Sequence, residues 1–251
     1  MTTPQVSADG EPTSGTTPAL EARAVAAGYG PQAVIHDIDL TVYPGEVVAL
    51  LGANGAGKTT TLLTLAGELP VLSGAVLMDG EATEAPLHIR ARKGLTFVTE
   101  EKSVFMGMST RDNLRVGGVD IDAALELFPE LADRINVRGG LLSGGEQQML
   151  TLARALGRKP RVLLADEMSM GLAPIIVQRL LEAVRMAAKA QGTAVLLVEQ
   201  HVRKALQYAD RAYVMRGGQI ELEGTAKELA ARIDEIEASY LAGPSVAAPS
   251  S

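Results

Sequence analysis

Eight residues from Gly52 to Thr59, with the sequence GANGAGKT, combine glycines, a lysine and a threonine in a spacing suited to binding phosphates. They fit the pattern G-x-x-x-x-G-K-[ST], whose glycines let successive backbone N–H groups point into one concavity. Lys58 would reach the β- and γ-phosphates, and the Thr59 hydroxyl would ligate Mg²⁺. A plain glycine turn would leave Lys58 unexplained, because the helix dipole disfavours a cation at a helix start. The predicted nucleotide contacts are Gly52, Asn54, Gly55, Gly57, Lys58, Thr59 and Thr60.

Two carboxylates, Asp166 and Glu167, stand at the end of the apolar run RVLLAD and directly after it, where they could bind a metal ion and activate water. A carboxylate at the end of a buried strand is costly without a compensating cation, so we expect Asp166 to bind the Mg²⁺ implied by Thr59. Glu167 is then placed to polarise an attacking water as general base, although an acid here is also typical of a helix N-cap. His201 follows another apolar run and would reach the γ-phosphate at the same sheet edge; alternatively, it is a capping or surface residue.

The stretch LSGGEQQ begins a second helix with an unusual first turn. Ser143 and Glu146 form a capping box, which explains those two residues but not the glycines between them. Gly144 and Gly145 leave the backbone bare at a helix N-terminus, where a phosphate is favoured. Because one chain would hold one nucleotide in its first site, we expect Ser143, Gly144 and Gly145 to cover the nucleotide held by a second copy of the chain.

Composition excludes several other classes of protein. The 251 residues include no cysteine, so neither a disulfide framework nor a thiolate metal site is possible. The net charge of −7, with both signs mixed along the chain, argues against a nucleic-acid partner. The apolar runs are too short to span a bilayer, and the N-terminus lacks the features of a secretory signal. Residues 1–19 and 242–251 are expected to be disordered arms, because they are rich in Pro, Ser, Thr, Ala and Gly.

Between these arms, short apolar runs alternate with amphipathic helices, which predicts an α/β fold with a mostly parallel core sheet. Three buried strands are expected at 46–52, 161–166 and 193–200, with a helix at 174–191 that begins with proline. The alternation in 20–30 and 33–43 predicts antiparallel strands, and a hairpin should turn at 217–218. The segment of about 87–158 is more helical, so we expect a helical subdomain inserted into the core of a domain spanning 20–241.

The motifs GANGAGKT, LSGGEQQ, LLADE and VEQH, in this order, resemble the ATP-binding subunit of an ABC transporter over about residues 20–241. The resemblance implies a P-loop ATPase fold in which two subunits hold two ATP molecules head to tail. It further implies that Ser143, Gly144 and Gly145 contact the γ-phosphate across the interface. Tyr29 would stack on adenine, and His201 would be the switch histidine.

Several positions depart from the usual family pattern. Glu100 replaces a glutamine, Met168 a proline and Ala173 an aspartate. The loop SMGLAP and the glutamate at position 100 resemble the importers of branched-chain and other hydrophobic amino acids. Glu100 is expected to join the Mg²⁺ or water shell, because Mg²⁺ prefers oxygen ligands. Ala173 removes the usual aspartate contact across the interface, whereas Ala165 and Met168 receive no functional interpretation from the sequence.

The resemblance implies partners as well as chemistry. A permease in the membrane, a second ATPase subunit and, indirectly, a solute-binding protein are expected, with this chain on the cytoplasmic face of the membrane. Exposed apolar residues in EEKSVFMGMSTRDNL, namely Phe105, Met106 and Met108, would lie where the permease docks, unless they pack in the core. Transport of urea, an amide or another solute is an alternative. So is a non-transport ABC ATPase, although the usual second cassette or coiled-coil insertion is absent.

Overall fold

A computed structural model describes residues 16–241, and side chains only up to residue 238. The predicted disordered arms therefore lie outside the described residues, except for 16–19. In that short part the prediction is wrong at Ala19, which is buried and whose N–H donates to the Val42 carbonyl at 2.9 Å. This bond continues the strand ladder by one residue, which explains why order begins before Leu20.

The core is a six-stranded sheet in the order β10-β9-β3-β8-β7-β6. Its strands β6, β7, β8, β3 and β9 are parallel, and β10 is antiparallel to β9. The bounds are β3 Val47–Gly52, β6 Leu95–Val98, β7 Val162–Asp166, β8 Ala194–Val198, β9 Arg211–Arg216 and β10 Gln219–Thr225. The three predicted buried strands and the hairpin at 217–218 are thus confirmed.

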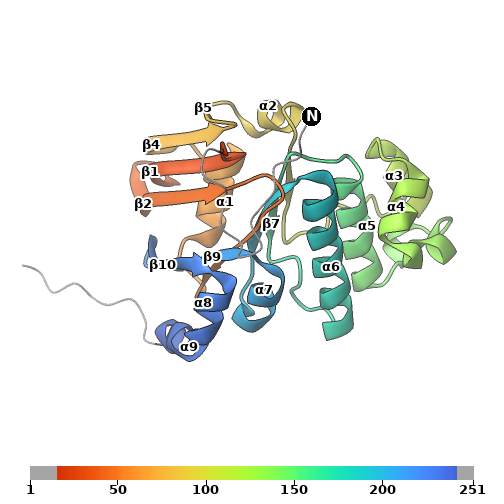
Figure 1. The fold of residues 1–251 in the computed structure, drawn as a ribbon. Coiled ribbons are helices and arrows are strands. Elements are labelled where there is room, and N and C mark those ends of the chain that lie inside the picture. Colours follow the sequence, from red (N-terminus) through yellow and green to blue (C-terminus); the bar gives the residue numbers. More distant parts are fainter. Residues whose placement is uncertain (1–15, 242–251) are drawn as a thin grey trace, which may run out of the picture.

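A second, antiparallel sheet has the order β2-β1-β4-β5 and lies to one side of the core in Figure 1. Its strands are β1 Leu20–Tyr29, β2 Gln32–Val42, β4 Val71–Met78 and the short β5 Glu81–Ala82. The first two strands pair as the alternation predicted. Helix α1, Lys58–Ala66, packs between the two sheets and begins directly after the glycine-rich loop.

The remaining helices cover the other face of the core and its two ends (Figure 1). They are α2 Leu87–Arg92, α3 Thr110–Val116, α4 Ile121–Leu127, α5 Gly144–Leu156, α6 Pro174–Gln191, α7 Val202–Tyr208, α8 Ala226–Ala231 and α9 Ile233–Leu241. Two 3₁₀ turns, Pro129–Arg134 and Gly139–Leu141, link α4 to α5. None of the helices between residues 16 and 241 is long and apolar enough to cross a membrane.

The helical insertion is narrower than the predicted range of about 87–158. Strand β6 lies inside that range but pairs with β7 in the core sheet, so the inserted helices are α3, α4 and α5. The short apolar run LTFV gives few residues from which to recognise this strand. Within the insertion, α4 ends at Leu127, and Pro129 begins a 3₁₀ turn because its ring disfavours a continuing helix.

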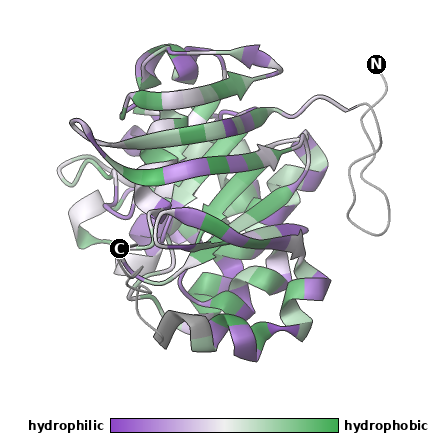
Figure 2. Cartoon of the chain, turned by 90° about the vertical axis from the view of Figure 1, so that its left-hand side faces the viewer, coloured by the Kyte–Doolittle hydropathy of each residue, from purple (hydrophilic) through white to green (hydrophobic). Residues whose placement is uncertain are grey.

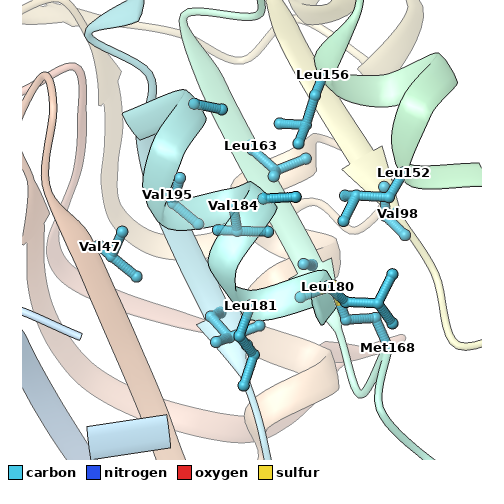
Figure 3. Close-up of a cluster of buried hydrophobic side chains, with 14 of the residues drawn as sticks. Val47, Val98, Leu152, Leu156, Leu163, Met168, Leu180, Leu181, Val184 and Val195 are labelled. Carbon is cyan, nitrogen blue, oxygen red and sulfur yellow. The ribbon is translucent and has the colours of Figure 1, made fainter. Parts of the chain in front are cut away.

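The parallel strands are buried on both faces and divide the apolar core into two clusters. Val47, Ala49 and Leu51 face α5, α6 and α7, whereas Val48 and Leu50 face α1 and the antiparallel sheet. Figure 2 shows apolar residues concentrated along the central strands. Figure 3 shows the first cluster, where Met168 lies beside Leu180 of α6. Met168 therefore has a packing role that the sequence left open.

Candidate functional site

A cleft of about 430 Å³ opens at the carboxyl edge of the core sheet, around the start of α1. This edge is where open α/β sheets bind their ligands. The cleft is lined by side chains from the glycine-rich loop, the ends of β7 and β8, the segment after β6 and strand β2. The lining residues are Val34, Asn54, Gly55, Gly57, Lys58, Thr59, Thr60, Glu100, Glu167, Met170 and Gln200.

The glycine-rich loop reaches its shape through backbone conformations that favour glycine. Gly55 and Gly57 have φ of 79° and 104°, in the left-handed region. A Cβ at Gly57 would lie 2.7 Å from Ile35 Cγ2, so a side chain there would also collide with β2. Helix α1 has no side-chain cap, which leaves its first amides facing the cleft. Loop and helix together offer backbone donors to a phosphate.

Lys58 lies at the centre of this arrangement. Its Nζ donates to the carbonyls of Gly52 at 2.9 Å and Ala53 at 3.0 Å, and lies 3.8 Å from Glu167 Oε1. Burial lowers the pKa of Lys58, and the nearby carboxylates of Glu167 and Asp166 oppose this shift. The cation is thus held by the loop it belongs to and directed into the cleft.

Asp166 lies beneath the cleft at the end of β7 and is almost fully buried. Burial raises its pKa, while a hydrogen bond from Thr59 and the charge of Lys58 oppose the shift. Its Oδ1 atom is buried without a hydrogen-bond partner among the described residues. An orphaned carboxylate oxygen beside a threonine hydroxyl fits a Mg²⁺ ion. Among the described residues, no three acidic or histidine side chains are placed so that they alone could hold a metal ion, so phosphate and water oxygens would complete the shell.

Glu167 follows Asp166 and has φ of 43°, in the left-handed region where non-glycine residues are uncommon. Its N–H donates to the Val198 carbonyl at 3.0 Å, which ties the end of β7 to β8. Its side chain enters the cleft and accepts a hydrogen bond from Gln200 Nε2 at 2.6 Å. Such strained backbone is typical of functional positions.

Gln200 is a cleft residue that the sequence prediction missed. The prediction named His201, but His201 is exposed, precedes α7 as its N-cap residue and is not among the residues that line the cleft. Alternation along β8 offered a signal, because Gln200 lies two residues after Val198, whose face packs toward α1. The geometry therefore favours Gln200 over His201 as the polar residue opposite Glu167.

Ser143 and Gly144 are exposed, and neither they nor Gly145 line the cleft. The predicted capping box is present: Ser143 Oγ accepts from the Glu146 N–H at 3.3 Å, and the Glu146 carboxylate accepts from the Ser143 N–H at 2.7 Å. Gly145 has a packing reason as well, since a Cβ there would lie 3.0 Å from Ile176 Cγ2. A Cβ at Gly144 would lie 3.1 Å from the flexible tip of Lys102 and 3.8 Å from Leu172 Cδ2, which is an ordinary contact distance.

Tyr29 lies at the end of β1, exposed, and is not among the residues lining the cleft. It pairs with Gln32 at the start of β2, the strand that contributes Val34 to the cleft. Glu100 lines the cleft from the segment after β6, and its charge acts on Asp166. The structure thus gathers the loop residues, both carboxylates and Glu100, and leaves Tyr29, His201 and the second helix start outside.

Comparison with known proteins identifies the family. The family model described as ABC transporter matches residues 35–170. The chain is 42% identical to the high-affinity branched-chain amino acid transport ATP-binding protein BraG of Pseudomonas aeruginosa, over 86% of this chain and 96% of that protein. It is 36% identical to the probable branched-chain amino acid transport ATP-binding protein LivF of Archaeoglobus fulgidus, over 81% and 90%.

A different transport task is named for a third relative. The lipopolysaccharide export system ATP-binding protein LptB of Escherichia coli K12 is 34% identical, over 84% of this chain and 92% of that protein. Among solved structures, an ATP-binding subunit of an ABC transporter matches with a TM-score of 0.75 and 25% identity, over 88% of this chain and 99% of that one. Together with the phosphate loop and the carboxylates that face it, these matches show that the chain belongs to the ABC transporter family and is one of its ATP-binding, ATP-hydrolysing subunits.

Proposed function

We propose that this ATPase powers the import of branched-chain or other hydrophobic amino acids through a membrane permease. The observation that carries the proposal is the identity of 42% to BraG over nearly the whole of both chains. The SMGLAP loop and Glu100, the latter at the cleft, agree with the same branch. The chain would act at the cytoplasmic face of the membrane, attached to the permease and supplied indirectly by a solute-binding protein.

In this proposal the cleft binds MgATP with its phosphates on the glycine-rich loop. Thr59, Asp166 and Glu100 would hold the Mg²⁺, which neutralises charge on the phosphates. Lys58 binds the β- and γ-phosphates, and the backbone amides of the loop and of the start of α1 donate further hydrogen bonds to the phosphates. Glu167 accepts a proton from the water that attacks the γ-phosphorus. The Glu167 carboxylate lies in the cleft beside Lys58, as this role requires.

A second ATPase subunit completes the site. Ser143, Gly144 and Gly145 do not line the cleft of their own chain, so their bare helix start would have to act on the nucleotide of a neighbour. The first amides of α5 have no partners within the helix, apart from that of Glu146, which Ser143 caps. Tyr29 would stack on adenine beside strand β2. The two subunits would be identical copies or paralogues.

The permease would dock on the inserted helices. Phe105 and Met106 are exposed by 45% and 49% in the segment between β6 and α3, and Leu141 is exposed nearby. Backbone bonds from Gly139 and Gly140 to Met108 and Met106 hold this apolar group together. Exposed methionine and phenylalanine on one patch are typical of a surface that receives a partner helix.

The proposal is tested by isolating the complex from membranes of cells that produce this chain with an affinity tag. A polytopic permease should co-purify, and ATP hydrolysis of the complex in liposomes should rise when leucine and its binding protein are added. The identity of 34% to LptB favours lipopolysaccharide export as the second candidate. Stimulation by lipopolysaccharide and not by leucine would establish that alternative, and stimulation by urea or an amide would replace the amino acid.

A further inference from the structure

We infer that Gln200 is a positioning residue for the Glu167 carboxylate, at the sheet edge where the sequence analysis placed His201 as a contact of the γ-phosphate. Gln200 Nε2 donates to Glu167 Oε2 at 2.6 Å, and both side chains line the cleft. The other carboxylate oxygen, Oε1, lies 3.8 Å from Lys58 Nζ. One oxygen of Glu167 is therefore fixed by a hydrogen bond, and the other forms an ion pair with Lys58. The inference rests on the proposed role of Glu167 as general base.

The direction of this hydrogen bond follows from the two functional groups. An ionised carboxylate only accepts hydrogen bonds, so the Gln200 amide must present its N–H groups to Glu167. A donor to the charged form stabilises that form and fixes its orientation. Gln200 carries no charge and does not titrate, so it holds the base without taking the proton that Glu167 must accept. A histidine in the same place would change its charge near neutral pH.

The backbone on both sides of this pair is held firmly. The Glu167 N–H donates to the Val198 carbonyl at 3.0 Å. Directly after the end of β8, the buried Glu199 accepts a hydrogen bond from Ser169 Oγ at 2.5 Å. These two links join the segment after β7 to the two residues that directly precede Gln200. The contact therefore belongs to a stiff connection rather than to two free side chains.

The test measures single-turnover and steady-state ATP hydrolysis by the full chain and its variants with MgATP. Gln200→Ala should lower kcat by about tenfold or more, with the ATP Kd changed less than about twofold, because the contact orients a reacting group and not the nucleotide. Gln200→Glu, of nearly the same shape, should lower kcat further by placing a second carboxylate opposite Glu167. Gln200→His should restore part of the rate, since imidazole again offers an N–H donor.

A double variant shows whether Gln200 acts through Glu167. In the Glu167→Gln background, Gln200→Ala should change the residual rate by less than about twofold, because residues that act as one unit are not additive. Gln219→Ala on the exposed hairpin is the matched control and should keep the wild-type rate. His201→Ala should lose less activity than Gln200→Ala.

Each contrary outcome has a separate meaning. The inference would be overturned if Gln200→Ala kept the wild-type kcat, or if His201→Ala lowered kcat more than Gln200→Ala does. If Glu167→Gln still lowered kcat in the same experiment, the proposed role of Glu167 as base would stand. Multiplying losses in the double variant would also overturn it, because Gln200 would then act independently of Glu167. Wild-type turnover in Glu167→Gln would instead remove the proposed role of Glu167 itself.

Discussion

Lys58 Nζ lies 3.8 Å from Glu167 Oε1, so the cation of the glycine-rich loop and the carboxylate after β7 form an ion pair in the cleft proposed for ATP. The two residues come from α1 and from the end of β7, and more than a hundred residues separate them in the chain. In the described structure Lys58 also donates to two loop carbonyls. A triphosphate entering the cleft therefore meets a cation that is already oriented.

Lys58→Ala should weaken ATP binding by at least about a hundredfold, because a charge-assisted contact to the phosphates is lost in a partly buried site. Isothermal titration calorimetry with MgATP measures the Kd. Lys227→Ala is the matched control, because it removes a lysine at an exposed position in α8. This variant should bind ATP with the wild-type Kd. Unchanged affinity in Lys58→Ala would count against the phosphate contact.

Gly144→Ala should lower the rate of ATP hydrolysis by about tenfold or more while leaving ATP binding to the single subunit unchanged. In its own chain the added methyl would meet the movable Lys102 tip and, at an ordinary contact distance of 3.8 Å, Leu172 Cδ2. It would nevertheless separate the helix start from a phosphate on the facing subunit. Calorimetry and steady-state hydrolysis together measure the two effects. A normal rate in this variant would argue against a facing nucleotide.

Gly145→Ala provides the comparison. Its Cβ would approach Ile176 Cγ2 at 3.0 Å, so the packing of α5 against α6 must shift within the same chain. We expect a loss of about 1–3 kcal/mol in the free energy of unfolding, measured by urea denaturation. If Gly144→Ala were destabilised just as strongly, its effect on hydrolysis would reflect folding and not a contact across the interface.

Glu199→Gln should make the fold less sensitive to pH. Burial raises the pKa of Glu199 from 4.5 to about 7, and only 3% of the residue is exposed. Below pH 4.5 the carboxyl is protonated in both states; as the pH rises to 7, the unfolded chain ionises first and stability falls by about 3 kcal/mol. The glutamine variant should lack this loss.

Urea unfolding at pH values near 4.5 and above 7 measures that difference. The gap in unfolding free energy between Glu199→Gln and the wild type should widen in favour of the variant as the pH rises. Ser169→Ala is a useful companion, because it removes the hydroxyl that donates to Glu199 at 2.5 Å. A gap that stayed constant across the pH range would show that Glu199 titrates normally in the folded protein.

The sequence predicted those parts of the site that depend on local spacing. The glycine-rich loop, the capping box at Ser143 and the proline start of α6 each lie within a few consecutive residues, and all are present. The strands β3, β7 and β8 were predictable because each is a continuous apolar run buried on both faces. The glycine-rich loop follows β3, and the carboxylates Asp166 and Glu167 stand at the end of β7, so predicting these strands also placed both groups at one edge of the sheet.

The features that the sequence did not predict depend on contacts between distant residues or on the direction of a side chain. Gln200 and His201 are neighbours in the sequence, and only Gln200 lines the cleft. Both follow the end of β8, so the alternation of the strand no longer fixes which side chain faces the cleft. The Ser169–Glu199 hydrogen bond joins residues 30 positions apart without a local pattern. Strand β6 has only four residues, and its pairing with β7 places it in the core sheet and not in the predicted helical insertion. Local motifs therefore located the site, and tertiary contacts decided which side chains enter it.

Glu167→Gln tests the central claim most directly, namely that the carboxylate facing Lys58 in this cleft is the base that hydrolyses ATP. Binding of MgATP is measured by calorimetry and turnover by release of phosphate. The account predicts a Kd within about twofold of the wild type and a kcat lower by at least about a hundredfold, as expected for the loss of a general base. Hydrolysis at the wild-type rate by this variant would contradict it.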